Sequence, residues 1–466
     1  MKKIFFLFFF LINLFFLFPQ TNLNKLSTED KILGLSIIWK EVSYNFAYFE
    51  RLPQIDWDNK YKEYLVKVIN SQNDYEYYIL LQEFMSILQE GHTYIIMPNY
   101  MQNMIYSNLR ELWFSYNWVD NNMYVTSTRK KIEKELPIGS QIVKINNLTI
   151  AEYINIYRAR INTPFEHTFK ANLINYFQFD LNNYPQNIEY IKPDGKKMFF
   201  EFDTANPKGL DWTQLPDFDI QKYIRINPNF TWIADSIAYF DMAGNMDENL
   251  LHFFDSIYPA ITKAKGLVVD LRYSQGGSSV GSHMIMHFIE NDTIVNYVQT
   301  RINNAHKKAF GAFSDSTIVS YFGGKIRNQQ FNDFYNDLSF ERDSFLIINT
   351  IPKANRCKIP IVFLIDSYVG SATENLLITL KSLDIGTFVG EPTVGSCTQP
   401  LIVKLPSNGF ALIATQKTML NKNEVFTYIK PDIEVKRTLE EIMSGKDKIF
   451  EVGLEVLKEK IRIKAK

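Results

Sequence analysis

From about residue 232 onward, the sequence alternates short apolar runs with amphipathic stretches. Two of the apolar runs lie in GLVVDLR (266–272) and IPIVFLID (359–366). Continuous apolar runs of this length are typical of strands that are buried on both faces, as in parallel sheets covered by helices. The segments ENLLHFFDSIYPAITKA (248–264) and SATENLLITLKSL (371–383) have the apolar spacing of such covering helices. The alternation predicts an α/β layer architecture for residues 207–440.

Two other regions precede this one. Residues 21–99 contain three amphipathic segments between Leu26 and Gln89, which predict a small helical domain followed by a short strand in YIIMP. Residues 100–206 alternate apolar and polar positions with frequent turn signals. Within them, LPIGSQIVKINNLTIAEYINIYRARI predicts a strand at Gln141–Ile145, an Asn-Asn turn, a second short strand and a helix. A charged helical tail is expected at 441–466.

The first twenty residues differ from the rest of the sequence in being almost entirely apolar after a short basic start. Lys2 and Lys3 precede an apolar run from Ile4 to Phe18, which is shorter than the roughly 20 residues of a membrane-crossing helix. This pattern favours a signal peptide, so the protein is expected to be exported to the periplasm or cell envelope. An uncleaved anchor remains the alternative, and it is the only membrane attachment that we expect.

Charge and cysteine content exclude several other classes. The 50 Lys and Arg residues almost balance the 51 Asp and Glu residues, so no nucleic-acid partner is expected. Cys357 and Cys397 are the two cysteines, and free thiols are the favoured interpretation. His283 and His287 stand four residues apart, but no third ligand is evident in the sequence. Neither a metal nor a cofactor is therefore expected.

One serine stands where a catalytic nucleophile could be held. The predicted strand at 359–366 is followed by Gly370, and Ser371 comes at the start of the next helix. A serine on such a turn exposes its hydroxyl beside helix amides that can stabilise an oxyanion. The alternative is a capping box, in which Ser371 caps the helix and Glu374 returns a hydrogen bond. This segment alone leaves both interpretations open.

A second segment favours the nucleophile. Asp270-Leu271-Arg272 is followed by Gly276 and Gly277, whose backbone amides could approach a ligand closely. Together, D-L-R-x-x-x-G-G, the later G-S-A-x-E and V-G-E-P-T resemble the C-terminal processing peptidase and tricorn core protease family. The order and distances of these blocks are compatible with that family.

The resemblance implies a serine peptidase with a crotonase-like βαβ catalytic domain. It implies that Ser371 is the nucleophile and that the Ala372 amide, with that of Gly276 or Gly277, forms the oxyanion hole. The processing-peptidase branch uses a Lys as base, but Ser396 occupies that position here. The tricorn-like branch uses a His before its PDZ domain, and His92 in Glu90-Gly91-His92-Thr93 matches it.

The resemblance also implies further roles. An acidic residue before the P-D-I segment would orient the base, and Glu424 is the candidate. Residues 100–206 resemble a PDZ domain, and the expected partners are peptides or unfolded protein segments. Two alternatives remain: a non-catalytic binding protein, in which Ser371 is only a cap, and a hydrolase of a non-peptide acyl substrate.

Overall fold

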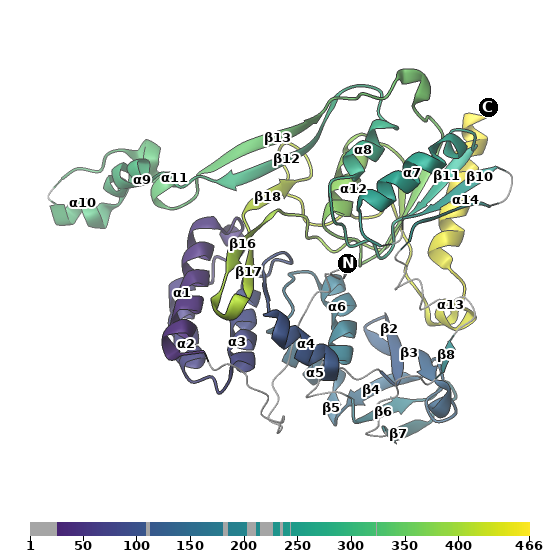
Figure 1. The fold of residues 1–466 in the computed structure, drawn as a ribbon, viewed down its shortest axis with the longest axis horizontal. Coiled ribbons are helices and arrows are strands. Elements are labelled where there is room, and N and C mark those ends of the chain that lie inside the picture. The colour runs from purple at the N-terminus through teal and green to yellow at the C-terminus, as the bar shows by residue number, and fades with distance from the viewer. Residues whose placement is uncertain are drawn as a thin grey trace.

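A computed structural model describes residues 26–466 except 109–111, 180–184, 203–210, 215–226, 234–235, 243 and 323. It is a mixed α/β protein of several domains, as the sequence predicts (Figure 1). The predicted signal peptide at 1–20 lies outside the described residues. None of the helices in the described part of the chain is both long and apolar enough to span a membrane.

The N-terminal helical region begins with three helices, and a polar side chain caps the start of each. They are α1 (Thr28–Asn45), α2 (Trp57–Ile69) and α3 (Asp74–Ser86). Ser27, Asp56 and Asn73 each accept a hydrogen bond from an amide in the first turn, which satisfies a donor that the helix itself leaves free. The three helices confirm the sequence prediction. A fourth, α4 (Asn99–Asn108), was not predicted.

The helical region is completed by a hairpin from much later in the chain. Strand β1 (Tyr94–Ile96) pairs antiparallel with β17 (Phe410–Ala414), which also pairs with β16 (Pro400–Lys404). Leu405, Ala411 and Ile413 are buried in one apolar cluster with residues of α1 and α3. The Ala414 amide also donates to Thr93 Oγ1 at 3.1 Å. Residues 90–96 are therefore supported both by the N-terminal helices and by the hairpin of residues 400–414.

The second region is a β-rich domain built as expected around Gln141–Ile145. This segment is strand β4, and it is followed by a turn at Asn146 and Asn147 with positive φ angles of 49° and 65°. Thr149 and Glu152 then form a capping box at the start of helix α5. The elements of this domain are β2 (Phe114–Val119), β3 (Asn122–Arg129), β4, β5 (Leu148–Thr149), α5 (Ile150–Arg158), α6 (Glu166–Phe179), β6 (Asn187–Ile191), β7 (Lys197–Glu201) and β8 (Trp212–Gln214).

The third region contains the predicted α/β layers. Its central sheet has the strand order β19-β15-β14-β11-β10-β9, and every neighbouring pair except β9 with β10 is parallel. The strands are β9 (Asn229–Ile233), β10 (Ile237–Asp241), β11 (Gly266–Asp270), β14 (Ile361–Ile365), β15 (Thr387–Gly390) and β19 (Ile433–Glu434). Both apolar runs noted in the sequence, β11 and β14, lie inside this sheet and are fully buried.

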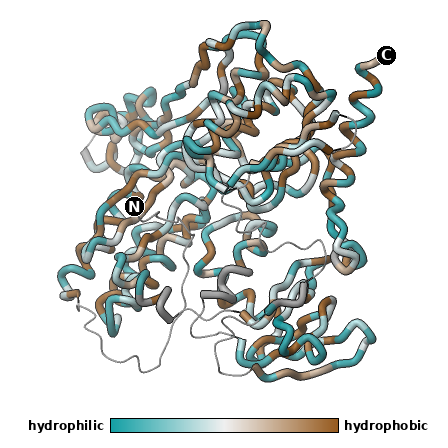
Figure 2. The backbone as a smooth tube through the Cα atoms, turned by 45° about the vertical axis from the view of Figure 1, so that its right-hand side comes forward, coloured by the Kyte–Doolittle hydropathy of each residue, from teal (hydrophilic) through white to brown (hydrophobic). Residues whose placement is uncertain are grey.

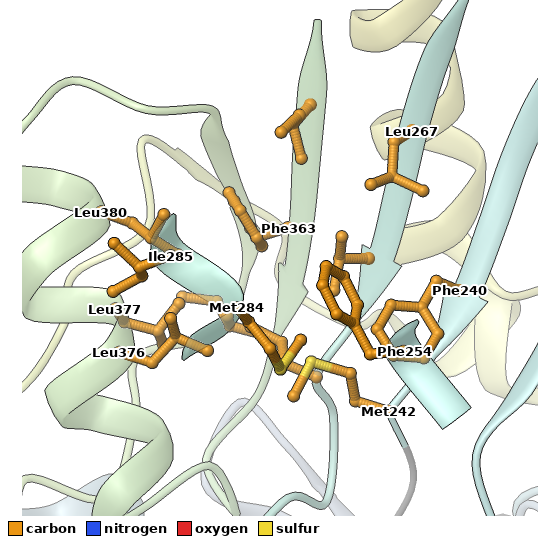
Figure 3. Close-up of a cluster of buried hydrophobic side chains, with 14 of the residues drawn as sticks. Phe240, Met242, Phe254, Leu267, Met284, Ile285, Phe363, Leu376, Leu377 and Leu380 are labelled. Atoms are coloured by element: carbon orange, nitrogen blue, oxygen red, sulfur yellow. The ribbon is translucent and has the colours of Figure 1, made fainter. Parts of the chain in front are cut away.

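Helices cover both faces of this sheet. One face packs against α7 (Glu248–Ile261), α8 (Gly281–Met286) and α12 (Ala372–Ser382). Figure 3 shows this core, where Phe254 of α7, Met284 of α8 and Leu377 of α12 meet Phe363 of β14. The other face packs against α14 (Lys448–Lys464), the predicted charged tail, whose hydrophilic and hydrophobic residues alternate along the tube in Figure 2. A short helix, α13 (Leu439–Ser444), precedes it.

A long arm extends from the α/β region, and the sequence did not predict it. Strands β12 (Thr293–Arg301) and β13 (Phe340–Ile347) pair antiparallel, and β12 also pairs with β18 (Gln416–Met419). Three short helices lie at the tip of the arm in Figure 1: α9 (Ala305–Gly311), α10 (Ser316–Phe322) and α11 (Asn332–Tyr335). Arg301 fixes the arm to the end of α1 through hydrogen bonds to the carbonyls of Ser43 and Phe46.

The predicted free thiols are also confirmed. Cys357 and Cys397 are free, buried thiols. Arg272, at the end of β11, pairs with the carboxylates of Asp270 and Asp447. Because Asp447 caps α14, this ion pair joins the start of the tail helix to the carboxyl edge of the sheet.

Candidate active site

Ser371 occupies a strained turn between β14 and α12. Its φ and ψ angles are 55° and −128°, a conformation that residues with a side chain rarely adopt. Its amide donates to the carbonyl of Ser396 at 2.8 Å, while its side chain makes no capping bond to the helix. The hydroxyl is instead directed away from the helix, as in a nucleophile elbow. The capping alternative therefore does not describe this serine.

His92 lies opposite Ser371, in the loop between α3 and β1. Its Nε2 is 3.2 Å from Ser371 Oγ. Burial lowers the pKa of the His92 imidazole to about 4, because the charged form loses its hydration. The ring is therefore neutral at pH 7 and can accept a proton from the hydroxyl. The two residues predicted as nucleophile and base, 279 positions apart, are brought within hydrogen-bonding distance.

The other ring nitrogen of His92 contacts a second serine. Ser396 Oγ is 2.6 Å from His92 Nδ1 and 3.3 Å from Glu90 Oε1. Glu90 is only 4% exposed, and burial raises the pKa of its carboxyl to about 7. Its other oxygen accepts from the His92 amide at 3.0 Å and from Thr93 Oγ1 at 2.8 Å. Ser371, His92, Ser396 and Glu90 thus form one continuous hydrogen-bonded chain.

Neighbouring elements fix both loops of this chain. Asn162, after α5, accepts from the Glu90 amide at 3.0 Å and donates to the Thr93 carbonyl. The buried Glu374 carboxylate on α12 accepts from the amides of Gly395 and Ser396 at 2.7 and 2.8 Å. The same burial raises the pKa of Glu374 to about 7. Asn162 therefore holds the loop of the base, and Glu374 holds the loop of Ser396.

The paired glycines line the other side of Ser371. Gly276 and Gly277 have positive φ angles of 90° and 141°. A Cβ at Gly276 would lie 2.5 Å from the Ala372 amide nitrogen and 2.7 Å from Ser371 Cβ. A side chain is excluded there both by the backbone angle and by the neighbouring atoms. Of the three residues predicted for the oxyanion hole, Gly276 and Ala372 are therefore adjacent to the nucleophile, whereas a Cβ at Gly277 would meet the Met246 carbonyl oxygen.

A pocket of about 490 Å³ opens above these residues. Ser371, His92, Ser396, Gly276 and Gly277 all contribute to its wall. The remaining lining residues come from all three regions of the chain, and several carry amide or hydroxyl groups: Asn162, Thr168, Asn172, Asn245, Gln275 and Tyr368. An extended chain with amide groups on both sides fits such a lining.

Glu424 lies elsewhere. Asn421 Oδ1 accepts from the amides of Asn423 and Glu424, which forms a turn after β18. The Glu424 side chain is exposed in this turn and accepts from Asn421 Nδ2 at 3.0 Å. In this structure the partner of His92 Nδ1 is Ser396, and this corrects the role predicted for Glu424.

Sequence reasoning also missed Glu90 and Ser396, the residues that continue the hydrogen-bonded series from Ser371 beyond His92. Glu90 is two residues before His92, and Ser396 was noted only as the residue standing where a related branch has its Lys. The signal that could have revealed them is the spacing Glu-x-His: the carboxylate of Glu90 can reach the amide of His92 and leave one oxygen for a further donor.

Comparison with known proteins identifies the family. Residues 224–435 match peptidase family S41. This part of the chain is therefore an S41-type peptidase region. The match includes Gly276, Ser371 and Ser396, whereas Glu90 and His92 lie before it. The protein is accordingly a serine-type peptidase, and the matched family is that of the C-terminal processing peptidases, which its motifs resemble.

Solved structures share the fold of this S41 peptidase. Mature CPAF in complex with lactacystin has a TM-score of 0.68 and 12% sequence identity, with 93% of this chain and 99% of that chain covered. A candidate peptidase from Parabacteroides merdae has a TM-score of 0.51 and 18% identity, with 93% and 97% covered. At these identities the likeness shows a common fold. No curated protein matches the sequence significantly.

Gly276 and Gly277 form the glycine wall beside Ser371. Replacing Gly276 with alanine tests whether this wall must lack a side chain. The new Cβ would press on the Ala372 amide and on Ser371 Cβ, so kcat should fall by about 10²-fold or more. Gly195→Ala is the matched control, because Gly195 also has a positive φ (85°) but has no atom within 4 Å of the added Cβ. That variant should lose on the order of 1 kcal/mol of stability and keep its kcat. Equal losses of activity in the two variants would contradict the proposed contact.

Proposed function

We propose that this protein is an exported serine endopeptidase or C-terminal processing-type peptidase that cleaves peptide bonds through an acyl-enzyme on Ser371. The observation that carries the proposal is the 3.2 Å approach of His92 Nε2 to Ser371 Oγ at a strained turn inside a pocket. A hydroxyl is a weak nucleophile alone, and a neutral imidazole at this distance supplies the base that it needs.

The chemistry follows from this geometry. Ser371 Oγ attacks the substrate carbonyl carbon while its proton moves to His92 Nε2. The carbonyl oxygen gains negative charge, and the amides of Ala372 and Gly276 or Gly277 stabilise it by donating hydrogen bonds. Collapse of this intermediate breaks the C–N bond, and the leaving amine takes the proton from Nε2. Water then attacks the ester by the reverse use of His92 and releases the acyl product.

Glu90 and Ser396 set the tautomer of His92. With Glu90 ionised, Ser396 donates to Glu90 Oε1 and accepts from His92 Nδ1–H, which leaves Nε2 free to accept from Ser371. With Glu90 protonated, the carboxyl can donate to Ser396, and Ser396 can then donate to Nδ1. The imidazole proton would in that case lie on Nε2, where it blocks the base. Ser396 and Glu90 are thus positioning residues for His92.

The pocket supports a peptide or unfolded protein segment as substrate. Its amide and hydroxyl side chains can pair with a peptide backbone, and the S41 family acts on peptides or proteins. The PDZ-like region could deliver such a segment, since Asn162 and Thr168 of this region line the pocket. Export through the signal-like first twenty residues would bring the enzyme to extracytoplasmic chains.

Fluorophosphonate labelling at neutral pH tests the proposal. Full-length protein should label in the wild type and lose labelling in Ser371→Ala and in His92→Ala. Because mature CPAF is known in complex with lactacystin, prior incubation with lactacystin should reduce the labelling. A folded wild type that never labels and cleaves no peptide would contradict the proposal.

The two alternatives predict different results. A non-catalytic binding protein needs Ser371 only as a helix cap, yet its side chain makes no capping bond and lies within reach of His92. A hydrolase of non-peptide acyl groups would retain the labelling. It would turn over acyl esters while leaving a peptide library uncut.

The pH dependence of kcat/KM should follow the ionisation of the Glu90 carboxyl. Since burial raises its pKa to about 7, the carboxyl is protonated below neutrality and ionised above it. The ionised form supports the productive tautomer, so kcat/KM should rise with pH and reach half of its maximum near pH 7. His92, with its pKa lowered to about 4, is already neutral throughout this range. A kcat/KM profile that is flat from pH 5.5 to 8.5 would contradict this assignment.

A further inference from the structure

Three side chains with metal-binding atoms meet on the outer side of the α/β region. Asp255 comes from α7, His283 from α8 and His287 from the residue after α8. One candidate ligand atom from each lies within 4.8 Å of the other two. The sequence offered only the two histidines, four residues apart; folding adds the carboxylate as a third donor.

The separations suit a tetrahedral ion. A zinc ion with bonds of about 2.0–2.1 Å holds its ligand atoms about 3.3 Å apart. His283 Nε2 and Asp255 Oδ1 are already 3.2 Å apart. The ligand atom of His287 lies within 4.8 Å of both, so a shift of at most about 1.5 Å would bring it to the same spacing. Two imidazoles and one carboxylate are also donors that zinc and its neighbours in the transition series accept.

The surrounding packing orients the ligands. His287 is 6% exposed, and its ring lies 4.1 Å from the ring of Tyr258, centroid to centroid. Its Nδ1 lies 3.4 Å from the His283 carbonyl, which leaves Nε2 for an ion. The neighbours of the ligands in sequence, Phe254 and Met284, are anchored in the core that Figure 3 shows. The backbones of the ligands are therefore held at a fixed separation.

The site also remains accessible. The side chains of His283 and Asp255 are 35% and 47% exposed, so an ion can enter from solvent without unfolding. Two protein nitrogens and one oxygen leave a fourth position for water or for another ligand.

We propose that Asp255, His283 and His287 bind a divalent ion of the zinc class, which clamps α7 to α8. The clamp has a structural consequence near the nucleophile. Met246, just before α7, forms a β-bridge with Gly277, just before α8. The ion would add a second link between α7 and α8, at residues that come after this bridge in the sequence. It would stabilise the segment that supplies the glycine wall beside Ser371.

Equilibrium binding of zinc chloride to the metal-stripped, tag-free full-length protein tests the site, with a chromogenic zinc indicator as competitor. The wild type should bind one ion per chain. Asp255→Asn, which preserves shape, and His283→Ala should each weaken binding by on the order of 10- to 100-fold. The melting temperature should rise with zinc in the wild type and should not rise in His283→Ala.

His306→Ala is the matched control. It also removes one histidine from the surface, but it lies on α9 of the arm, far from α7 and α8 in Figure 1. Its zinc affinity should equal that of the wild type. Wild-type affinity in both Asp255→Asn and His283→Ala would overturn the proposal, as would equal loss in all three variants.

Discussion

Replacement of Ser371 by alanine is expected to remove almost all peptidase activity, by about 10⁶-fold in kcat. The change deletes the nucleophile, and no covalent intermediate can then form. It should not unfold the protein, because the Ser371 side chain makes no helix-capping bond and the amide hydrogen bond to Ser396 remains. Alanine would still adopt the strained φ of 55°, so the melting temperature should change little. Hydrolysis of a fluorogenic peptide and thermal denaturation measure the two quantities.

Ser367→Ala is the appropriate control. Ser367 lines the same pocket, but its hydroxyl contacts Glu391 at 3.4 Å. This variant should keep kcat within a few-fold of the wild type, since its hydroxyl takes no part in proton transfer. If Ser371→Ala retained substantial activity while Ser367→Ala lost it, the nucleophile would have been wrongly assigned.

Replacement of Ser396 by alanine should have the second largest effect, a loss of about 10² to 10⁴-fold in kcat with KM nearly unchanged. The variant removes the 2.6 Å partner of His92 Nδ1 and separates Glu90 from the imidazole. The base then has no group to hold its Nδ1–H tautomer or to stabilise the imidazolium as it forms. Steady-state kinetics at pH 8 would give kcat and KM separately.

Glu90→Gln distinguishes this positioning role from simple structural damage. The amide keeps the shape of the carboxylate but cannot ionise, so the rise of kcat/KM near pH 7 should disappear along with much of kcat. A merely structural role predicts a lower rate with the same pH profile. Retention of the full pH profile in Glu90→Gln would therefore exclude Glu90 as the group that sets the tautomer.

Much of the fold could be predicted from local patterns. The apolar runs of β11 and β14 specify strands buried on both faces, and the capping residues before α1, α2 and α3 specify where these helices begin. The arm could not be predicted in this way. Strand β13 is exposed along most of its length, so its sequence shows neither a buried run nor a one-sided alternation. The pairing of β1 with β17 is equally invisible, because it depends on a contact across more than 300 residues.

For the candidate site too, residues marked by local sequence patterns could be predicted, and residues that depend on tertiary contacts could not. Ser371, Gly276 and Gly277 stand directly after buried strands, where chain order alone brings them to one edge of the sheet. His92 was proposed by resemblance, and its contact with Ser371 depends on tertiary structure. The role predicted for Glu424 was wrong because a turn initiated by Asn421 directs the Glu424 side chain outward. Ser396 was recognised only as the absence of a lysine, since a lone serine carries no local signal of a role.

The pairing of β1 with β17 has a consequence for the protein during its own synthesis. Thr93 beside the base receives its hydrogen bond from Ala414, and the core under residues 90–96 includes Ile413. While Ser371 has left the ribosome but residues 410–414 have not, the loop of the general base therefore lacks this support. N-terminal segments fold first as a chain emerges, yet here a hairpin made late in synthesis completes the first-made region. We therefore expect full peptidase activity only after residues 410–414 have left the ribosome.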